Sequence, residues 1–235
     1  MAGRLYLVPA WLSEDAPVES VLPTTVLERI RTLNDFVVED AKSARRFLTA
    51  CGHPGPMRDV AMKELNEHTA ARDVPDLLEA VRAGRDVGLL SEAGVPAVAD
   101  PGSLLVAAAH AEGIAVVPLS GPSSIVLALM ASGLEGQRFR FLGYLPADAS
   151  ERTKAILELE KRSARERETQ VFIETPYRND ALFASLLESC RPGTRIAIAV
   201  DLTGPEESVR MQAVEAWRRK PATIGKRPAT FLLLA

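Results

Sequence analysis

Cysteine is scarce in this sequence, since Cys51 and Cys190 are the only two among 235 residues. They lie far apart along the chain and neither belongs to a C-x-x-C motif, so no disulfide framework is indicated. His53 follows Cys51 closely, but a zinc site needs more ligands than this pair provides. We therefore expect no metal site.

Long apolar runs and a strong net charge are also missing. No stretch approaches the roughly 20 apolar residues of a membrane helix, and no basic segment followed by an apolar one opens the chain, so we expect a cytoplasmic protein. With 28 Lys+Arg against 31 Asp+Glu, the formal charge is −3, which argues against a protein that binds nucleic acid through its overall charge. An RNA partner would have to meet a local patch or be presented by a larger assembly.

Short apolar, β-forming runs alternate with segments of helical periodicity, which predicts an α/β protein with mostly parallel sheets. Strands are expected at residues 5–8, 36–38, 87–90, 114–119, 139–145, 171–173, 196–200 and 231–234. Helices are expected at residues 26–33, 44–50, 75–83, 104–111, 125–132, 151–167 and 179–188. Residues 209–219 fit either a strand entering a helix or a single helix. The length favours two domains, which we place at residues 1–118 and 119–235.

A Gly/Pro-rich loop, S-E-A-G-V-P-A-V-A-D-P-G at residues 91–102, separates a predicted strand from a predicted helix. Gly94 and Gly102 have no Cβ and allow a ligand to approach the main chain, while Pro96 and Pro101 restrict φ. The loop is therefore predicted to be stiff and open to a ligand.

A second loop of this kind, S-G-P-S-S at residues 120–124, follows the next predicted strand. Ser123 or Ser124 is a candidate N-cap, which would leave free N–H groups facing the loop. Either loop alone also fits the ordinary turn chemistry of an α/β protein.

Together the motifs S-x-A-G-x-P-x-x-x-D-P-G and P-x-x-G-P-S-S resemble the S-adenosylmethionine-dependent tetrapyrrole methylase superfamily. The most similar branch is the 16S ribosomal RNA cytidine-2'-O-methyltransferases. Precorrin-type members are less similar, since their Gly-Pro-Gly turn after the first strand does not occur here. Further segments that carry the resemblance are Arg4 to Pro9, Val38 to Asp40, Leu65 to His68, Phe139 to Pro146, Phe172 to Asn179, Asp201 to Thr203, and Glu206.

The sequence departs from the ribosomal RNA branch at several motifs. The T-P-I-G-N-L loop is replaced at residues 8–15, E-D-T-R reads E-D-A-K at residues 39–42, and R-E-L-T-K is altered at residues 200–204. The printed sequence ends at Ala235, before a small segment usual in that branch. We therefore expect a shortened and divergent member, with the changes mostly where the acceptor would be recognised.

The resemblance implies a tetrapyrrole-methylase-like fold of two α/β domains with mostly parallel sheets and an S-adenosylmethionine cleft between them. It also implies a homodimer, with ribosomal RNA or a ribosomal subunit as acceptor. The cofactor contacts that it implies are Ala93, Gly94, Val95, Ala97, Val98, Ser123, Ser124, Ile125, Phe172, Ile173, Pro228, Ala229 and Thr230.

A ribose hydroxyl is a poor nucleophile until it loses its proton, so transfer to a 2'-oxygen would benefit from a general base. The candidates are Asp40, Glu67, His68 and Glu174. Each also has a structural interpretation, because Asp40 could cap a helix, Glu67 and His68 could be surface residues, and Glu174 could end a strand.

Several other side chains could meet RNA. Lys42, Arg45 and Arg46 could contact phosphates or could be the solvated side of a helix. Trp11 could stack on a base or wall a pocket, and Arg178 could bind an anion or pair on the surface.

The favoured prediction is an S-adenosylmethionine-dependent methyltransferase acting on an RNA ribose. One alternative is a methyltransferase of the same fold with another small-molecule or RNA acceptor, and another is a non-catalytic S-adenosylmethionine-binding protein. A nucleotide-dependent oxidoreductase has little support, because no G-x-G-x-x-G motif follows a predicted strand.

Overall fold

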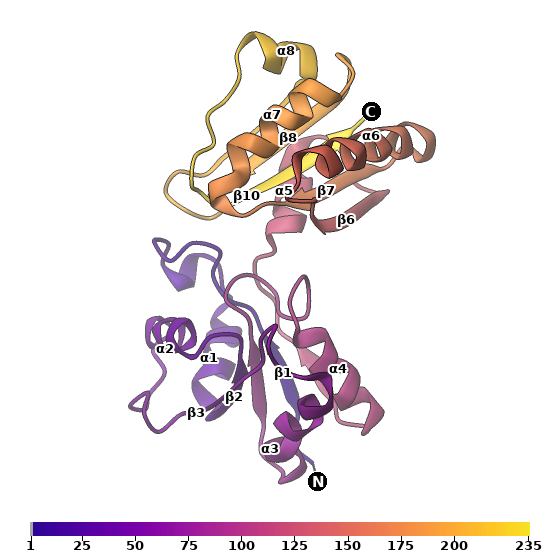
Figure 1. Ribbon diagram of the computed structural model, residues 1–235. Coiled ribbons are helices and arrows are strands. Elements are labelled where there is room, and N and C mark those ends of the chain that lie inside the picture. Colours follow the sequence, from indigo (N-terminus) through magenta and orange to yellow (C-terminus); the bar gives the residue numbers. More distant parts are fainter. Residues whose placement is uncertain (1) are drawn as a thin grey trace. The chain divides into compact units, whose positions relative to one another are not determined.

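A computed structural model describes residues 2–235 of the protein. The chain divides into two compact units between Ser123 and Ser124, and each unit has its own sheet (Figure 1). The α/β class predicted from the sequence is confirmed.

The division falls slightly later than the sequence-based boundary at residue 118, because the segment after the fifth strand stays with the first unit. Leu119 N–H donates to the carbonyl of Leu7 at 3.0 Å, which continues the strand pairing. A Cβ on Gly121 would lie 2.3 Å from Pro9 Cβ, so the segment also passes tightly against the loop after the first strand.

The first unit contains a five-stranded parallel sheet with the strand order β3-β2-β4-β1-β5. Its strands are β1 (Leu5–Val8), β2 (Asp35–Val38), β3 (Ala61–Glu64), β4 (Val87–Leu90) and β5 (Val116–Pro118). Its helices are η1 (Val18–Ser20), α1 (Thr24–Thr32), α2 (Ala41–Ala50), η2 (Ala71–Leu78), α3 (Glu79–Arg82) and α4 (Gly102–Ala111).

Both faces of this sheet are covered, as expected for parallel strands. Tyr6 and Val8 of β1 pack into one core cluster with residues of α1 and α2, and Leu5 packs into another with residues of η2, α3 and α4. Alternate side chains of a strand point to opposite faces, so every β1 residue meets a helix layer. Only the edge strand β3, A-M-K-E, escaped sequence prediction, because three of its four residues are exposed.

The second unit contains the sheet β6-β7-β10-β8-β9. Its strands are β6 (Phe139–Tyr144), β7 (Thr169–Ile173), β8 (Arg195–Val200), β9 (Ser208–Ala213) and β10 (Ala229–Leu234). Its helices are α5 (Ser124–Ser132), α6 (Ala149–Glu166), η3 (Pro176–Arg178), α7 (Asn179–Ser189) and α8 (Val214–Arg219).

This second sheet is mainly antiparallel, which differs from the expectation of parallel sheets throughout. The β6–β7 pair is parallel, whereas β10 pairs antiparallel with both β7 and β8, and β8 pairs antiparallel with β9. Only the short turn at residues 201–207 joins β8 to β9, and a turn of that length cannot make a parallel crossover. The ambiguous segment 209–219 is a strand entering a helix, β9 followed by α8.

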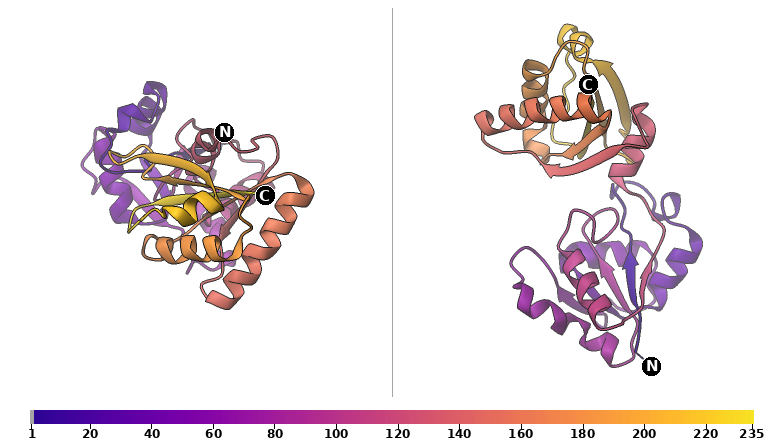
Figure 2. Two further views of the ribbon diagram at one scale, coloured as in Figure 1. Left: turned by 90° about the horizontal axis from the view of Figure 1, so that it is seen from above. Right: turned by 90° about the vertical axis from the view of Figure 1, so that its right-hand side faces the viewer.

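Helices cover both faces of the second sheet (Figure 2). Residues of α6 and α7 share a core cluster with Phe172, Phe231 and Trp217, whose indole N–H donates to the Ile196 carbonyl at 3.0 Å. On the other face α5 packs against β10 and β8.

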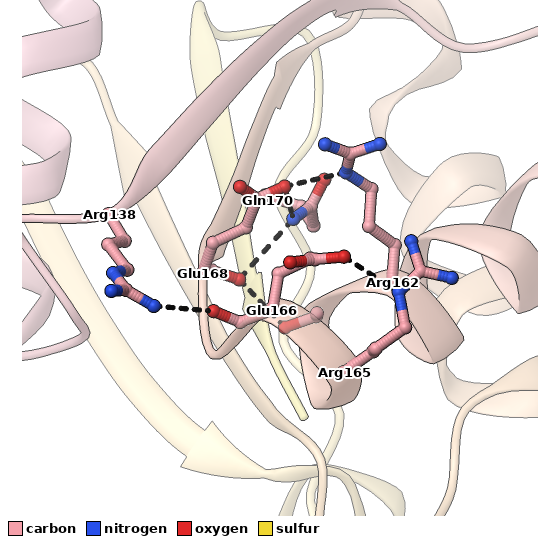
Figure 3. Close-up of polar contacts among 7 residues, drawn as sticks. Arg138, Arg162, Arg165, Glu166, Glu168 and Gln170 are labelled. Carbon is pink, nitrogen blue, oxygen red and sulfur yellow. Dashed lines mark hydrogen bonds and ion pairs between the residues drawn. The ribbon is translucent and has the colours of Figure 1, made fainter.

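A polar network closes the turn between α6 and β7 (Figure 3). Arg162 pairs with Glu168 at 2.7 Å, Gln170 Nε2 donates to the same carboxylate, and Arg138 donates to the Glu166 carbonyl at 3.5 Å. The charged residues at the end of α6 are therefore paired within this turn.

Candidate functional site at the carboxyl edge of the first sheet

The loops that follow β1, β2, β4 and β5 meet at one edge of the first sheet, where the carboxyl ends of the parallel strands lie. In open α/β sheets, ligands bind outside this edge, close to a point where the strand order reverses. The chain order changes beside β1, which lies between β4 and β5. Both Gly/Pro-rich loops predicted from the sequence lie at this edge.

The loop of residues 91–102 has an unusual backbone. Gly94 has a φ of +71°, and Ala97 and Ala99 both have a φ of +66°. For the two alanines, which carry a Cβ, this conformation costs about 1 kcal/mol or more each. Asp100 stabilises the conformation, because both of its carboxylate oxygens accept from Ala97 N–H at 2.9 Å and Oδ1 accepts from Gly102 N–H at 2.7 Å. Backbone strain of this kind is concentrated at ligand sites and switches.

The two glycines of this loop are positions of close approach. A Cβ on Gly102 would lie 2.7 Å from Asp100 Oδ1, so any side chain there would displace the carboxylate that fixes the loop. A Cβ on Gly94 would lie 3.3 Å from Leu12 and 3.6 Å from the Pro122 carbonyl. The first loop is therefore adjacent to both the β1 loop and the second Gly/Pro loop.

The β1 loop is fixed to the first Gly/Pro loop by main-chain contacts. Ala10 N–H donates to the Gly94 carbonyl at 2.8 Å, and Gly94 N–H donates to the Trp11 carbonyl at 3.4 Å. The Trp11 ring is buried and meets Phe47 edge to face, with ring centroids 5.5 Å apart. Trp11 is therefore mostly a core residue, and its remaining surface lines a pocket, the second of the two uses considered from the sequence.

Two carboxylates at this edge were not among the site residues predicted from the sequence. Burial raises the pKa of Glu39, and the nearby Glu92 and Asp100 carboxylates add to the effect. Burial also raises the pKa of Asp100. Glu39 Oε2 accepts from Glu92 N–H at 3.1 Å, so it too helps to hold the loop. Both carboxylates line a small pocket with Ser91 and Gly102. In the sequence, the feature that could have identified Glu39 as a site residue is its position directly after a predicted strand.

Three of the four general-base candidates lie at the same edge. Asp40 accepts from the N–H of Ser43 at 2.7 Å and from its hydroxyl at 2.8 Å, and these bonds lower the pKa of Asp40. It is therefore the N-cap of α2, as its structural interpretation predicted. Glu67 and His68 follow β3, are exposed, and lie 3.7 Å apart.

The fourth candidate, Glu174, belongs to the second unit and is buried. Its Oε1 accepts from Arg178 Nε at 2.9 Å and Nη2 at 2.6 Å, and from Thr175 N–H at 2.7 Å. Arg178 is thus paired with a carboxylate, and hydrogen bonding to Glu174 raises the pKa of Arg178. Glu174 Oε2 is buried and has no hydrogen-bond partner among residues 2–235.

The predicted cofactor residues form two groups, one in each unit. Ala93, Gly94, Val95, Ala97 and Val98 lie in the first loop, where Ala93 and Val98 are exposed. Ser123 is the last residue of the first unit, and the next two predicted contacts, Ser124 and Ile125, begin α5 in the second.

The remaining cofactor candidates lie at one end of the second sheet. Ile173 pairs with Thr230 at the carboxyl end of β7 and the start of β10, beside Ala229 and just after Pro228. Phe172 is fully buried and its ring stacks on Phe231 with centroids 5.9 Å apart, so its side chain belongs to the core.

The basic residues of α2 lie on a solvated face. Lys42, Arg45 and Arg46 are exposed, and Arg46 forms an ion pair with Glu14. Phe47, on the opposite side of the helix, is buried. This arrangement is that of an ordinary amphipathic surface helix.

The two cysteines are buried and free, and burial raises the pKa of each thiol to about 12. His53 Nε2 lies 2.7 Å from the Leu33 carbonyl, and this polar contact accounts for the burial of the histidine.

Within residues 2–235, no cluster of three or more His, Cys, Asp and Glu side chains has a metal-binding arrangement. In the same part of the chain, no helix combines the length and apolar character needed to span a bilayer.

The sequence profile of the Tetrapyrrole (Corrin/Porphyrin) Methylases matches residues 22–216. The chain belongs to this family. A relative from Halalkalibacterium halodurans named Ribosomal RNA small subunit methyltransferase I is 33% identical over 95% of the chain and 74% of the relative. A relative of the same name from Streptococcus pyogenes serotype M1 is 34% identical over 86% of the chain and 66% of the relative.

The family fold extends to solved structures of low sequence identity. The methyltransferase CobJ has a TM-score of 0.64 at 19% identity, covering 98% of this chain and 94% of that one. This likeness shows the shared fold, whereas membership of the methylase family rests on the sequence profile, whose matched segment includes the loop of residues 91–102.

Proposed function

We propose that the protein is an S-adenosylmethionine-dependent methyltransferase that methylates a ribose 2'-hydroxyl of small-subunit ribosomal RNA. The observation that carries the proposal is the loop of residues 91–102, a strained loop fixed by Asp100 at the carboxyl edge of a parallel sheet. The names of the similar relatives support the choice of acceptor.

The loop fits the cofactor chemically. Three of its four exposed residues, Ala93, Val98 and Ala99, are small and apolar, and the fourth is Glu92. S-adenosylmethionine supplies an activated methyl group, so the protein's task is to bind it, exclude water and orient the acceptor. The proposed contacts in the first unit are Ala93, Gly94, Val95, Ala97, Val98 and Ser123, and those in the second are Ser124, Ile125, Phe172, Ile173, Pro228, Ala229 and Thr230.

The proposed general base is one of Asp40, Glu67, His68 and Glu174. One carboxylate oxygen of Asp40 and one of Glu174 already accept hydrogen bonds from protein groups. Each residue would therefore take the proton through its other oxygen. Glu67 and His68 are exposed and reach solvent freely. Single-turnover rates of the four alanine variants distinguish them, because loss of the base lowers the rate about 100-fold or more and leaves cofactor affinity unchanged.

The test of the function is transfer of labelled methyl groups from S-adenosylmethionine to purified small ribosomal subunits, with nuclease digestion to locate the label on a ribose. Gly94→Trp is the matched negative variant, because a large side chain at φ +71° would fill the space beside Leu12 and block the loop. We expect calorimetry to show cofactor binding by the wild type and loss of binding in Gly94→Trp, with the circular dichroism spectrum unchanged.

Two results would contradict the proposal in different ways. Wild-type protein that fails to bind S-adenosylmethionine would remove the cofactor assignment. Binding without transfer to any subunit would indicate a different acceptor or a non-catalytic binding protein.

Two further proposals come from the family resemblance, a homodimeric state and a cytoplasmic location. Light scattering during size-exclusion chromatography tests the first, and cell fractionation tests the second.

A further inference from the structure

An exposed aromatic pair lies at the end of the second sheet where β6 and β7 finish. Tyr144 ends β6 and is 57% exposed, and Tyr177 follows β7 within η3 and is 71% exposed. Parallel pairing of the two strands places Tyr144 beside Ile173, four residues before Tyr177, so two segments that are distant in sequence meet here. More than half of the surface of each tyrosine stays exposed to water and is therefore available to a ligand.

Arg178 lies at this aromatic pair. Its guanidinium carbon is 5.5 Å from the centroid of the Tyr177 ring, within cation–π range. Hydrogen bonding to Glu174 is the main cause that raises the pKa of Arg178, so the guanidinium stays charged at this position.

The guanidinium is fixed in position. It donates through Nε and Nη2 to the buried Glu174 carboxylate, an ion pair whose carboxylate side chain is 0% exposed. An arginine carries five N–H donors, so others are left for a base edge or a phosphate. Because Glu174 already holds the Arg178 side chain in place, that side chain loses little conformational entropy when a ligand binds to it.

A second positive charge lies nearby. Asn179 Nδ2 donates to the carbonyls of Gly225 and Arg227 at 3.1 and 2.8 Å, and Asp180 accepts from Ile224 N–H at 2.8 Å. These bonds hold the segment around the exposed Lys226 against the start of α7, next to Arg178. A local cationic site of this kind is what a protein of net charge −3 needs to meet a phosphate backbone.

We propose that Tyr144, Tyr177 and Arg178 form a stacking surface that holds an unpaired nucleobase of single-stranded RNA, with Lys226 contacting the adjoining phosphate. Aromatic rings and arginine planes are the groups on which unstacked RNA bases rest, and such stacking tolerates any base. The assignment of RNA as the ligand rests on the proposed function, whereas the surface itself rests on the geometry.

The experiment is fluorescence anisotropy of a labelled, mixed-sequence single-stranded RNA oligonucleotide titrated with the full-length protein. The variants are Tyr177→Ala, Tyr177→Phe, Tyr144→Ala and the control Phe139→Ala. Phe139 is also an exposed aromatic of β6, 44% accessible, but it lies at the opposite end of the strand from Tyr144.

We expect Tyr177→Ala and Tyr144→Ala each to weaken RNA binding about 10-fold. Tyr177→Phe keeps the ring and should stay within about 2-fold of the wild type, as should Phe139→Ala. Calorimetric titration with S-adenosylmethionine should give the same affinity for all the variants.

The possible failures are distinguishable. Wild-type protein that binds no RNA, or alanine variants that bind RNA as the wild type does, would overturn the stacking surface even if cofactor binding and methyl transfer are intact. An equal loss in Phe139→Ala would also overturn it, because the effect would then not belong to this site. Loss of cofactor binding in the wild type would remove the proposed function, and the RNA titration would still decide the surface.

Discussion

Replacing Asp100 by alanine tests whether the strained loop is the cofactor site. The substitution removes the acceptor of two backbone N–H groups, those of Ala97 and Gly102. A hydrogen bond to a charged group contributes about 1.5 kcal/mol or more, which gives about 3 kcal/mol for the pair. Burial raises the pKa of Asp100, so its removal also relieves the cost of a half-buried charge. We expect a net effect of about 2 kcal/mol.

This free energy should appear in ligand binding as well as in stability. Without Asp100, Ala97 and Ala99 are no longer held at positive φ, so the loop relaxes and the cofactor must reorder it on binding. A cost of about 2 kcal/mol corresponds to about 30-fold weaker affinity. Asp100→Asn keeps one carbonyl oxygen for Gly102 N–H and should fall between the alanine variant and the wild type.

The assays are urea unfolding and calorimetric titration with S-adenosylmethionine, and Asp86→Ala is the matched control. Asp86 precedes β4 at its other end and accepts a single backbone N–H, from Arg4 at 2.9 Å. We expect Asp86→Ala to lose about 1 kcal/mol of stability and no cofactor affinity. If Asp100→Ala unfolds more easily but binds the cofactor as tightly as the wild type, the loop is structural and the cofactor lies elsewhere.

Two predictions concern buried carboxylates of the second unit. Although burial alone would raise it, hydrogen bonds from Thr194 and Arg191 hold the pKa of Glu160 below its ordinary value of 4.5. Glu160 therefore stabilises the fold above that pH, and the contribution is lost as the pH falls through its folded pKa. Urea unfolding of Glu160→Gln should show a deficit at neutral pH that shrinks in acid, and a pH-independent deficit would contradict this. Arg178→Met should cost about 2 kcal/mol, because it leaves Glu174 buried and unpaired, and adding Glu174→Gln should restore most of it in the same assay. No recovery in the double variant would mean that the loss comes from packing.

Sequence reasoning singled out the Gly/Pro-rich loop of residues 91–102 because its information is local. Gly94, Gly102 and the two prolines between a strand and a helix specify a stiff turn regardless of what surrounds it. The cap role of Asp40 could also be anticipated, since a cap depends on residues within one helical turn.

Other features of each unit depend on residues that are distant in sequence. The role of Glu39 follows from its contact with Glu92, which exists because β2 and β4 are neighbours in the sheet. The aromatic pair of Tyr144 and Tyr177 exists because β6 and β7 run parallel. The sequence alone does not encode pairing order in a local pattern, so neither arrangement was predicted.

The α/β class, most element positions, the two ligand-type loops and the methylase resemblance were determined by the sequence by itself. Periodicity and turn chemistry depend on near neighbours, and near neighbours are visible in a sequence. The antiparallel pairing of β10, the burial of Trp11 and the pairing of Arg178 with Glu174 were decided only by the tertiary structure. Each of these depends on which strands pair and which faces are covered, and that choice is made by long-range packing across the whole core.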